Sequence, residues 1–527
     1  MIGKPEIKIW IRSNTDEVEK FAGMELQRYL FQILDQPVDL VSFPNNISNS
    51  PIIYLSGDGQ NAPAVFSRHK ENLLSDGYLL HGTQNGAFLQ AQTPRGLLYA
   101  VYGILKYLGA RWFFPGPEGE VIPHLKGLEL AGLDLIDRPV IQQRGVLIRG
   151  TDRYLKEWID FAPKIGLNAF ALETHHGIHD LPNLARGRGL HLRLRRHFFP
   201  TIFCSQDEYN LHWEETLVKG YLQSLPDEIE SIHIRPADAQ GKRCTCAVDS
   251  QYSLTDQVMR FTNRMAKVAR QVRPEMEYPY VAYQSTWGPP PQVKPDPGVI
   301  LSLAPIHRCF NHAVTDPDCP INSPYQYNEL FDRSGYGVRP IFEEHMKEFD
   351  PTTTFVVDYW VDASYFGRGR QKLWDRRIPN IGGILQKDIQ FYHSLGISSI
   401  WTFVVFVDDT YLEKFTSPLI FQYGNLLWNP DIDLRAGIRD FCQQYLGDES
   451  LAEVFPLEEP SDPRDITPEV WDKHIARISK TLSITREKAT REKNDLFRKR
   501  ILRLAKEQEF SLGVMQMYKK EAGTTKL

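Results

Sequence analysis

Between residues 140 and 425 the chain repeatedly alternates short apolar runs with longer stretches of helical periodicity. Strands that are apolar on both faces are typical of parallel sheets covered by helices. The sequence therefore predicts an α/β fold whose main domain, residues 136–425, is a (β/α)8 TIM-type barrel. The expected strands, of which HLRLR is the weakest because it alternates with arginine, are GVLI (145–148), NAFAL (168–172), HLRLR (191–195), SIHIR (231–235), YPYVAY (278–283), VILSLA (299–304), TFVVDYW (354–360) and SIWTFVVF (399–406).

A small α/β domain is expected ahead of the barrel, over residues 1–135. IKIWI (7–11) and PIIYLSGDG (51–59) have the composition of buried strands, and the pair Asn85-Gly86 predicts a β-hairpin. Two helices are also expected. Their N-cap oxygens are offered by Ser13, Asn14 or Thr15 and by Thr93, which Pro94 follows.

The last part of the chain, residues 426–527, is expected to be helical. Thr467 and Pro468 suit a helix start, and apolar residues then repeat at helical spacing. We interpret this part as an amphipathic helical cap that packs on the barrel or on a second copy of the chain, as in a homo-oligomer. The two apolar stripes are Trp471, Ile475, Ile478 and Leu482, and then Leu496, Phe497 and Leu504.

Composition narrows the range of partners. The net charge of −5 offers no basic field for nucleic acid or an acidic membrane surface. No apolar run approaches the roughly 20 residues that cross a bilayer. The first residues show no apolar segment behind a basic start, so we expect a cytoplasmic protein, or a secreted one if the chain has been trimmed. Aromatic residues make up 12% of the chain, which fits either sugar-stacking surfaces or a large core.

Functional side chains of a (β/α)8 barrel gather where the strands end. Three acids stand out: Glu173 and Asp238, which follow expected strands, and Asp358, to which the apolar run TFVV leads. Glycoside hydrolysis needs two carboxyl groups, or one carboxyl and a substrate amide. We therefore expect these three residues to be catalytic, although each acid could instead cap a helix or pair with an arginine. The expected substrate-binding residues are His176, His197, Tyr283, Trp287, Trp360, His307 and Asp408.

The six cysteines are expected to be free thiols, because the chain is large and shows no small-scaffold spacing. A rival interpretation is a structural zinc site. Cys-x-Cys is not the usual Cys-x2-Cys knuckle, however, so we expect no metal. We also expect no other cofactor, because no phosphate-binding glycine loop follows a strand. The soft ligands that the rival interpretation would draw on are Cys244, Cys246, His307, Cys309, His312 and Cys319.

Several segments of the chain carry a family resemblance. FAGMELQRYLFQILDQPV and TPRGLLYAVYGILKYLGARWFFPGPEGEVIP resemble the N-terminal α/β domain of β-hexosaminidases and α-glucuronidases. DAQGKRCTC, the helix-like LTDQVMRFTNRMAKVARQV with the residues after it, and LAPIHRCFNHAVTDPDCPIN resemble the barrel of the family known as domain of unknown function 4838. Part of that family is glycoside hydrolase family 163, whose members are endo-β-N-acetylglucosaminidases.

The resemblance implies a glycosidase that acts on a β-linked saccharide, with N-acetylglucosamine in the substrate. Asp238 would act at the scissile bond, and Glu173 or Asp358 would be the general acid. The loop Asp238-Ala239-Gln240 before the cysteines departs from the usual family pattern. A catalytically silent saccharide-binding protein on the same fold is therefore the alternative.

Overall fold

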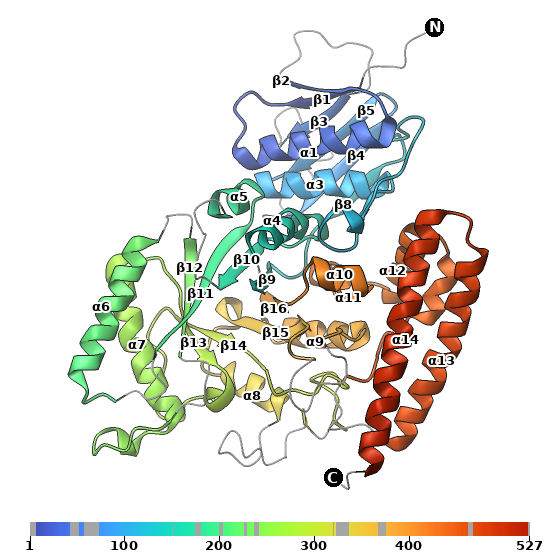
Figure 1. Ribbon diagram of the computed structural model, residues 1–527. Coiled ribbons are helices and arrows are strands. Elements are labelled where there is room, and N and C mark those ends of the chain that lie inside the picture. The colour runs from blue at the N-terminus through green and yellow to red at the C-terminus, as the bar shows by residue number, and fades with distance from the viewer. Residues whose placement is uncertain are drawn as a thin grey trace.

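The fold was described from a computed structural model of the 527-residue chain. The main-chain conformation is described for residues 7–42, 52–56, 73–149, 151–173, 181–199, 204–225, 229–236, 242–319, 321–322, 337–366, 376–461 and 467–524. The elements fall into an N-terminal sheet, a larger central sheet and a C-terminal group of helices (Figure 1).

The N-terminal sheet has six strands in the order β2-β1-β3-β5-β4-β8. Its first four strands in that order are mutually parallel, whereas β4 pairs antiparallel with both β5 and β8. Two helices, α1 (Glu17–Leu34) and α3 (Pro94–Tyr107), contact each other and the sheet. The strands are β1 (Ile7–Ile11), β2 (Val38–Ser42), β3 (Ile52–Ser56), β4 (Tyr78–Thr83), β5 (Gly86–Ala91) and β8 (Asp134–Asp137).

Local sequence signals explain most of these boundaries. The hairpin predicted at Asn85-Gly86 joins β4 to β5. Thr93 caps α3, because its hydroxyl oxygen accepts the Gly96 N–H at 3.0 Å. The predicted cap of α1 was wrong by one residue, since Asp16 caps it and its carboxylate accepts the Glu19 N–H at 2.8 Å. The carboxylate also places a negative charge at the positive end of the helix dipole.

The central sheet has eight parallel strands in the order β12-β11-β10-β9-β16-β15-β14-β13. Every strand expected from the sequence is present, including the arginine-bearing one. The strands are β9 (Gln143–Arg149), β10 (Ala169–Glu173), β11 (His191–Phe199), β12 (Ile229–Pro236), β13 (Tyr278–Ala282), β14 (Val299–Leu303), β15 (Phe355–Asp362) and β16 (Ser399–Val405).

Helices follow most of these strands. Residues 283–298, all of which the structure describes, contain only the 3₁₀ turn Gln284–Thr286, so β13 and β14 are joined without an α-helix. The helices after the other strands are α4 (Asp152–Phe161), α5 (Leu181–Gly187), α6 (Glu208–Ser224), α7 (Leu254–Val272), α8 (Val338–His345), α9 (Gly382–Ser394), and then α10 (Asp409–Lys414) and α11 (Leu419–Trp428).

Contacts across the sheet show that it is strongly curled. Arg193 on β11 lies with its guanidinium carbon 4.2 Å from the ring centre of Phe355 on β15, four places away in the strand order. Arg195 lies equally close to Phe403 on β16. Strands four places apart in a flat sheet would be about 19 Å apart, so these side chains meet across a concave interior.

The two ends of the strand order, β12 and β13, contact each other. Among the described residues no hydrogen-bonded ladder joins them, and the described strands form a strongly curled parallel sheet. Close packing inside the curled sheet explains why residue 145 on β9 is a glycine. A Cβ atom there would lie 2.2 Å from the indole of Trp401.

The C-terminal part is helical, as expected. The two longest helices, α13 (Pro468–Arg491) and α14 (Asp495–Thr524), lie side by side along one flank of the molecule (Figure 1). Thr467 caps α13 as expected. Trp471, Ile478 and Leu482 are buried, whereas Leu496 at the start of α14 is exposed, contrary to the expected second stripe. No helix in the described ranges is both long and apolar enough to cross a bilayer.

Candidate active site

The carboxyl ends of the eight central strands meet at one end of the sheet, where loops can bring side chains from several strands together. Several expected site residues fall outside the residues that the structure describes. Asp238 and His176 are outside them altogether. For Glu173, the last residue of β10, and His197, within β11, only the main chain is described. Their catalytic and binding roles stay predictions.

Asp358 on β15 lies inside the core and has no exposed surface. Its Oδ2 atom accepts hydrogen bonds from Arg308 Nη1 at 2.8 Å and from the Tyr392 hydroxyl at 2.9 Å. Its Oδ1 atom accepts the Tyr359 N–H at 2.7 Å. The carboxylate is therefore held by three donors. The sequence left two roles open for this acid, catalysis and pairing with an arginine, and the structure shows the arginine pair.

A second buried carboxylate shares the same arginine. Arg308 Nη2 lies 2.6 Å from Asp388 Oδ2, which also accepts the Trp360 indole N–H at 3.1 Å. Burial raises the pKa of Asp388 to about 6; Arg308 opposes the rise and Asp358 adds to it.

The aromatic residues expected to stack on a sugar lie at different depths. Trp360 is fully buried, and Trp287, which is almost fully buried, packs edge-on against Phe342 with ring centres 5.8 Å apart. Tyr283 is half-buried, and its hydroxyl oxygen accepts a hydrogen bond from the Gln284 side chain at 3.1 Å. His307 is also half-buried. Of these four residues, Tyr283 and His307 retain surface that a ligand can reach.

A cavity of about 1310 Å³ opens beside the end of β16. Its lining comes from the segment 114–118 in the N-terminal part, from Arg153 and Glu157 on α4, from Arg376, from the residues after β16, and from the first half of α14. Asp408 lines the cavity and caps α10, because its carboxylate accepts the Tyr411 N–H at 3.1 Å. Asp408 therefore lies at a concave surface, and its role in substrate binding stays a prediction.

Two further acids of this cavity are coupled through an arginine. Arg153 on α4 contacts Glu157 at 3.3 Å and Asp409 at 3.3 Å. Burial and the neighbouring Asp409 carboxylate raise the pKa of Glu157, whereas Arg153 lowers it. Glu157 therefore holds a proton more readily than a free glutamate does.

Phe406, immediately after β16, has a strained backbone. Its φ of 59° is in the left-handed region, which bulky side chains rarely occupy. The ring is 42% exposed, and the Arg376 guanidinium lies 4.6 Å from its centre. Strain of this kind persists where the surrounding structure enforces it, and often at ligand sites.

The sequence did not single out Glu157, Phe406 or Arg376. Glu157 lies on a helix after the first strand, and its helical spacing resembles that of any exposed acid. Phe406 was expected to be the last residue of a strand, and no sequence pattern distinguishes a left-handed phenylalanine from an extended one. The acidic pair Asp408-Asp409 after an apolar strand was the available signal for this cavity.

Comparison with solved structures finds glycoside hydrolases of several families. BtGH115A, a family GH115 4-O-methyl-α-glucuronidase with specificity for decorated arabinogalactans, matches 97% of this chain and 72% of its own length, with a TM-score of 0.63 and 12% identity. The family GH20 exo-β-N-acetylglucosaminidase from Vibrio harveyi covers 87% of this chain and 75% of its own, with a TM-score of 0.51 and 11% identity.

A third structure, the β-hexosaminidase from Streptomyces plicatus, covers 88% of this chain and 95% of its own length, with a TM-score of 0.51 and 12% identity. No protein-family model and no curated protein matches the chain by sequence. The resemblance to the family known as domain of unknown function 4838 therefore stays a prediction. In fold, the chain is similar along nearly its whole length to glycoside hydrolases.

Proposed function

We propose that this protein is a glycoside hydrolase that acts on a β-linked, N-acetylglucosamine-containing saccharide, and that its central sheet closes into a (β/α)8 barrel. The observation that carries the proposal is the fold likeness to glycoside hydrolases over 97% of the chain. Two of the similar structures are an exo-β-N-acetylglucosaminidase and a β-hexosaminidase. Membership in the family known as domain of unknown function 4838 is part of the proposal.

The reacting acids in this proposal are Asp238 and Glu173. Glu173 ends β10, and Asp238 follows β12, whose last residue is Pro236. Strands β10 and β12 both pair with β11, so their ends are about 10 Å apart. Side chains that lean toward each other from that separation can bring carboxyl groups to the about 5 to 9.5 Å that glycosidases use.

Glu173 would protonate the leaving oxygen, and Asp238 would act at the opposite side of the scissile bond or orient a substrate acetamide. Asp358 is the alternative acid of this proposal. Its three hydrogen bonds and its pairing with Arg308 favour a structural role for it. Asp408, Phe406 and Arg376 would hold a more distant sugar in the cavity beside β16.

The test is turnover of aryl β-N-acetylglucosaminides, aryl glucuronides and N-glycan glycopeptides by the purified protein. Asp238→Asn and Glu173→Gln should each lower kcat by about 10²-fold or more while leaving the thermal midpoint unchanged. Asp134→Asn, an exposed acid on β8, is the matched control and should retain full activity. Absence of turnover on all three substrate classes would contradict a glycosidase of this specificity.

One observation favours the alternative of a catalytically silent saccharide-binding protein. Three of the described acids on or near this end of the sheet pair with arginines: Asp358 with Arg308, and Glu157 and Asp409 with Arg153. Isothermal titration with the same glycans separates the two functions. Binding without hydrolysis, weakened by Phe406→Ala, would support the alternative, whereas wild-type turnover would exclude it.

A further inference from the structure

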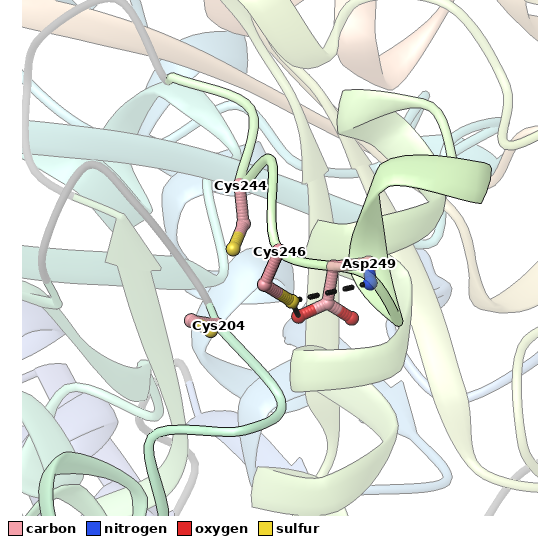
Figure 2. Close-up of side chains that lie close together, drawn as sticks. All are labelled: Cys204, Cys244, Cys246 and Asp249. Atoms are coloured by element: carbon pink, nitrogen blue, oxygen red, sulfur yellow. Dashed lines mark hydrogen bonds between the residues drawn. The ribbon is translucent and has the colours of Figure 1, made fainter.

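Two neighbouring connections of the central sheet bring three thiols and a carboxylate together. Cys204 lies between β11 and α6, and Cys244, Cys246 and Asp249 lie between β12 and α7. One ligand atom from each of the four residues lies within 4.8 Å of the other three. Figure 2 shows the three sulfur atoms and the Asp249 carboxylate around a common point.

The four ligand atoms lie close enough together for a small tetrahedral ion site, and one pair is near the spacing that zinc requires. Zinc bonds of about 2.3 Å to sulfur and about 2.0 Å to oxygen place tetrahedral neighbours about 3.5 to 3.8 Å apart. Cys246 Sγ and Asp249 Oδ2 are 3.4 Å apart. The Asp249 N–H also points at Cys246 Sγ, at 3.3 Å, and so stabilises negative charge on the sulfur.

Hydrogen bonds hold the donor atoms in place from outside. Asp249 Oδ2 accepts the Ser205 N–H at 2.6 Å, and its Oδ1 accepts the Ser205 hydroxyl at 2.8 Å and Arg260 Nη1 at 2.6 Å. The Gln257 side chain on α7 clamps Cys244 by accepting its N–H at 2.8 Å and donating to its carbonyl at 3.0 Å. Such outer partners orient metal ligands and are usual around metal sites.

Charge balance is consistent with a cation at this cluster. Metal binding deprotonates cysteine ligands, so the bound site would hold three thiolates and one carboxylate, with four negative charges, and Arg260 contacts Asp249 from outside. A dication leaves a net charge of about −1 once Arg260 is counted. Soft sulfur donors favour zinc over magnesium or calcium, and four protein ligands leave no open position for catalysis.

We propose that Cys204, Cys244, Cys246 and Asp249 bind a structural zinc ion that joins the β11–α6 connection to the β12–α7 connection. The sequence had considered Cys244 and Cys246 as ligands and expected no metal. Cys204 was not among its soft ligands. The cysteines come together because Cys204 and Cys244 follow strands that are neighbours in the sheet. The spacing of the cysteines along the chain does not reveal this. The ion would hold the connection that leaves β11 against the connection that leaves β12.

A second group, Cys309, His312 and Cys319, has three candidate ligands within the same distance limit, one fewer than the first. Its ligand atoms include Cys309 Sγ and His312 Nδ1, which are 3.6 Å apart. The proposal concerns the four-ligand group alone, and the experiment separates the two.

The experiment measures zinc per chain by mass spectrometry of the dialysed full-length protein grown with zinc. Cys204→Ala and Cys246→Ala should each lose one equivalent of zinc relative to wild type. Cys442→Ala, at a buried thiol remote from the group, and Cys319→Ala, in the second group, should leave that equivalent bound. Retention of all zinc by both Cys204→Ala and Cys246→Ala would overturn the proposal, as would a wild-type protein without zinc.

A measurement on the wild-type chain tests the site even if the cysteine variants fail to fold. After chelation and addition of Co²⁺, the four-ligand site should give a thiolate-to-cobalt charge-transfer band and intense visible bands typical of tetrahedral cobalt. The bands should persist in Cys319→Ala. Chelation should also lower the thermal midpoint of wild type, because a metal that binds only the folded state stabilises it. Absence of the cobalt bands in both proteins would contradict the site regardless of glycosidase activity.

Discussion

Arg308 carries one positive charge between two buried carboxylates, those of Asp358 and Asp388. Moving three ionised groups out of water is costly unless each is paired, and removal of one partner leaves an uncompensated charge. The three residues come from the β14–α8 connection, from β15 and from α9. The three residues therefore join segments that are far apart in the sequence. A residue that joins such segments is expected to stabilise the fold, which is one of the two roles considered for Asp358.

Asp358→Asn distinguishes a structural role from a catalytic one. If Asp358 serves mainly to pair with Arg308, the substitution should lower the free energy of unfolding by about 3 kcal/mol, as measured by urea titration. Asp134→Asn, at an exposed acid, should change it by less than about 0.5 kcal/mol. Unchanged stability together with a large loss of turnover would instead identify Asp358 as a catalytic acid.

Phe406 allows backbone strain and ring contact to be separated. Phe406→Ala and Phe406→Gly both remove the ring, so both should raise KM for a bound saccharide to a similar extent. Only glycine adopts the left-handed conformation without a steric cost, so Phe406→Gly should be about 1 kcal/mol more stable than Phe406→Ala. Equal stability of the two variants would show that the backbone relaxes when the ring is removed.

At the scale of elements, a buried carboxylate joins the N-terminal unit to the central sheet. Asp76 accepts hydrogen bonds from Arg95 on α3 and from Arg144 on β9, both at 2.7 Å. The indole N–H of Trp428, at the end of α11, donates to Asp137 on β8 at 2.8 Å. Polar contacts thus link the two sheets at Arg144 on β9 and at Trp428 at the end of α11.

The effect of Asp76→Asn on the free energy of unfolding should depend on pH. Burial alone would raise the pKa of Asp76, but Arg144 and Arg95 outweigh it and the pKa is lowered. A lowered folded-state pKa stabilises the protein above the unfolded pKa of about 3.9 and stops doing so as the pH falls through the folded value. The stability difference between wild type and variant should therefore be about 3 kcal/mol at pH 7 and shrink below about pH 4.

Stability measured between pH 3 and pH 8 checks this expectation. A difference that stays constant across the range would mean that the ionised state of Asp76 contributes nothing to stability.

The sequence predicted element type better than it predicted side-chain partners. Apolar runs such as VILSLA identify strands because burial on both faces needs apolar residues throughout. HLRLR was the weakest candidate because its arginines contradict that rule. They are nevertheless buried, since Arg193 and Arg195 stack on aromatic rings inside the curl. Those rings come from strands about 160 to 210 residues later, so no local pattern could show them.

The site was predictable to the level of a strand end and no further. The acids after β16 were visible as Asp408-Asp409, and both line the cavity. The burial of Trp360 depends on its hydrogen bond to Asp388 on α9, which lies 28 positions away. The grouping of Cys204 with Cys246 depends on strand adjacency. Both facts follow from tertiary structure, which residue spacing does not encode.

At the scale of the whole molecule, a buried ion cluster docks α14 on the central part. Arg377 donates to Glu507 on α14 at 2.7 Å and to Glu459 at 2.8 Å. Glu507 also accepts the Thr416 N–H at 2.6 Å. The helical cap expected from the sequence therefore packs on its own chain and closes one side of the cavity beside β16.

Arg377→Met should release this cap, because it leaves two buried carboxylates without their shared guanidinium. We expect the free energy that docks α14 on the central part to fall by about 3 to 5 kcal/mol. Proteolysis between the central part and α13 should then be faster. Limited trypsin digestion followed by mass spectrometry measures the cleavage. Arg486→Met, at an exposed pair with Glu509, is the control and should digest like wild type. Equal cleavage of both variants would contradict docking through Arg377.

The strand order has a consequence for how the chain is made. The first central strand, β9, pairs with the last, β16, and Gln143 lies opposite Ser399 in their register. A ribosome must therefore synthesise more than 250 further residues before β9 gains its second neighbour. During that interval β9 has an unpaired edge that is open to misassociation. The last strand of the N-terminal sheet ends at residue 137, before β9 begins. The N-terminal sheet can therefore fold first and lie next to β9 while the rest of the central sheet is synthesised.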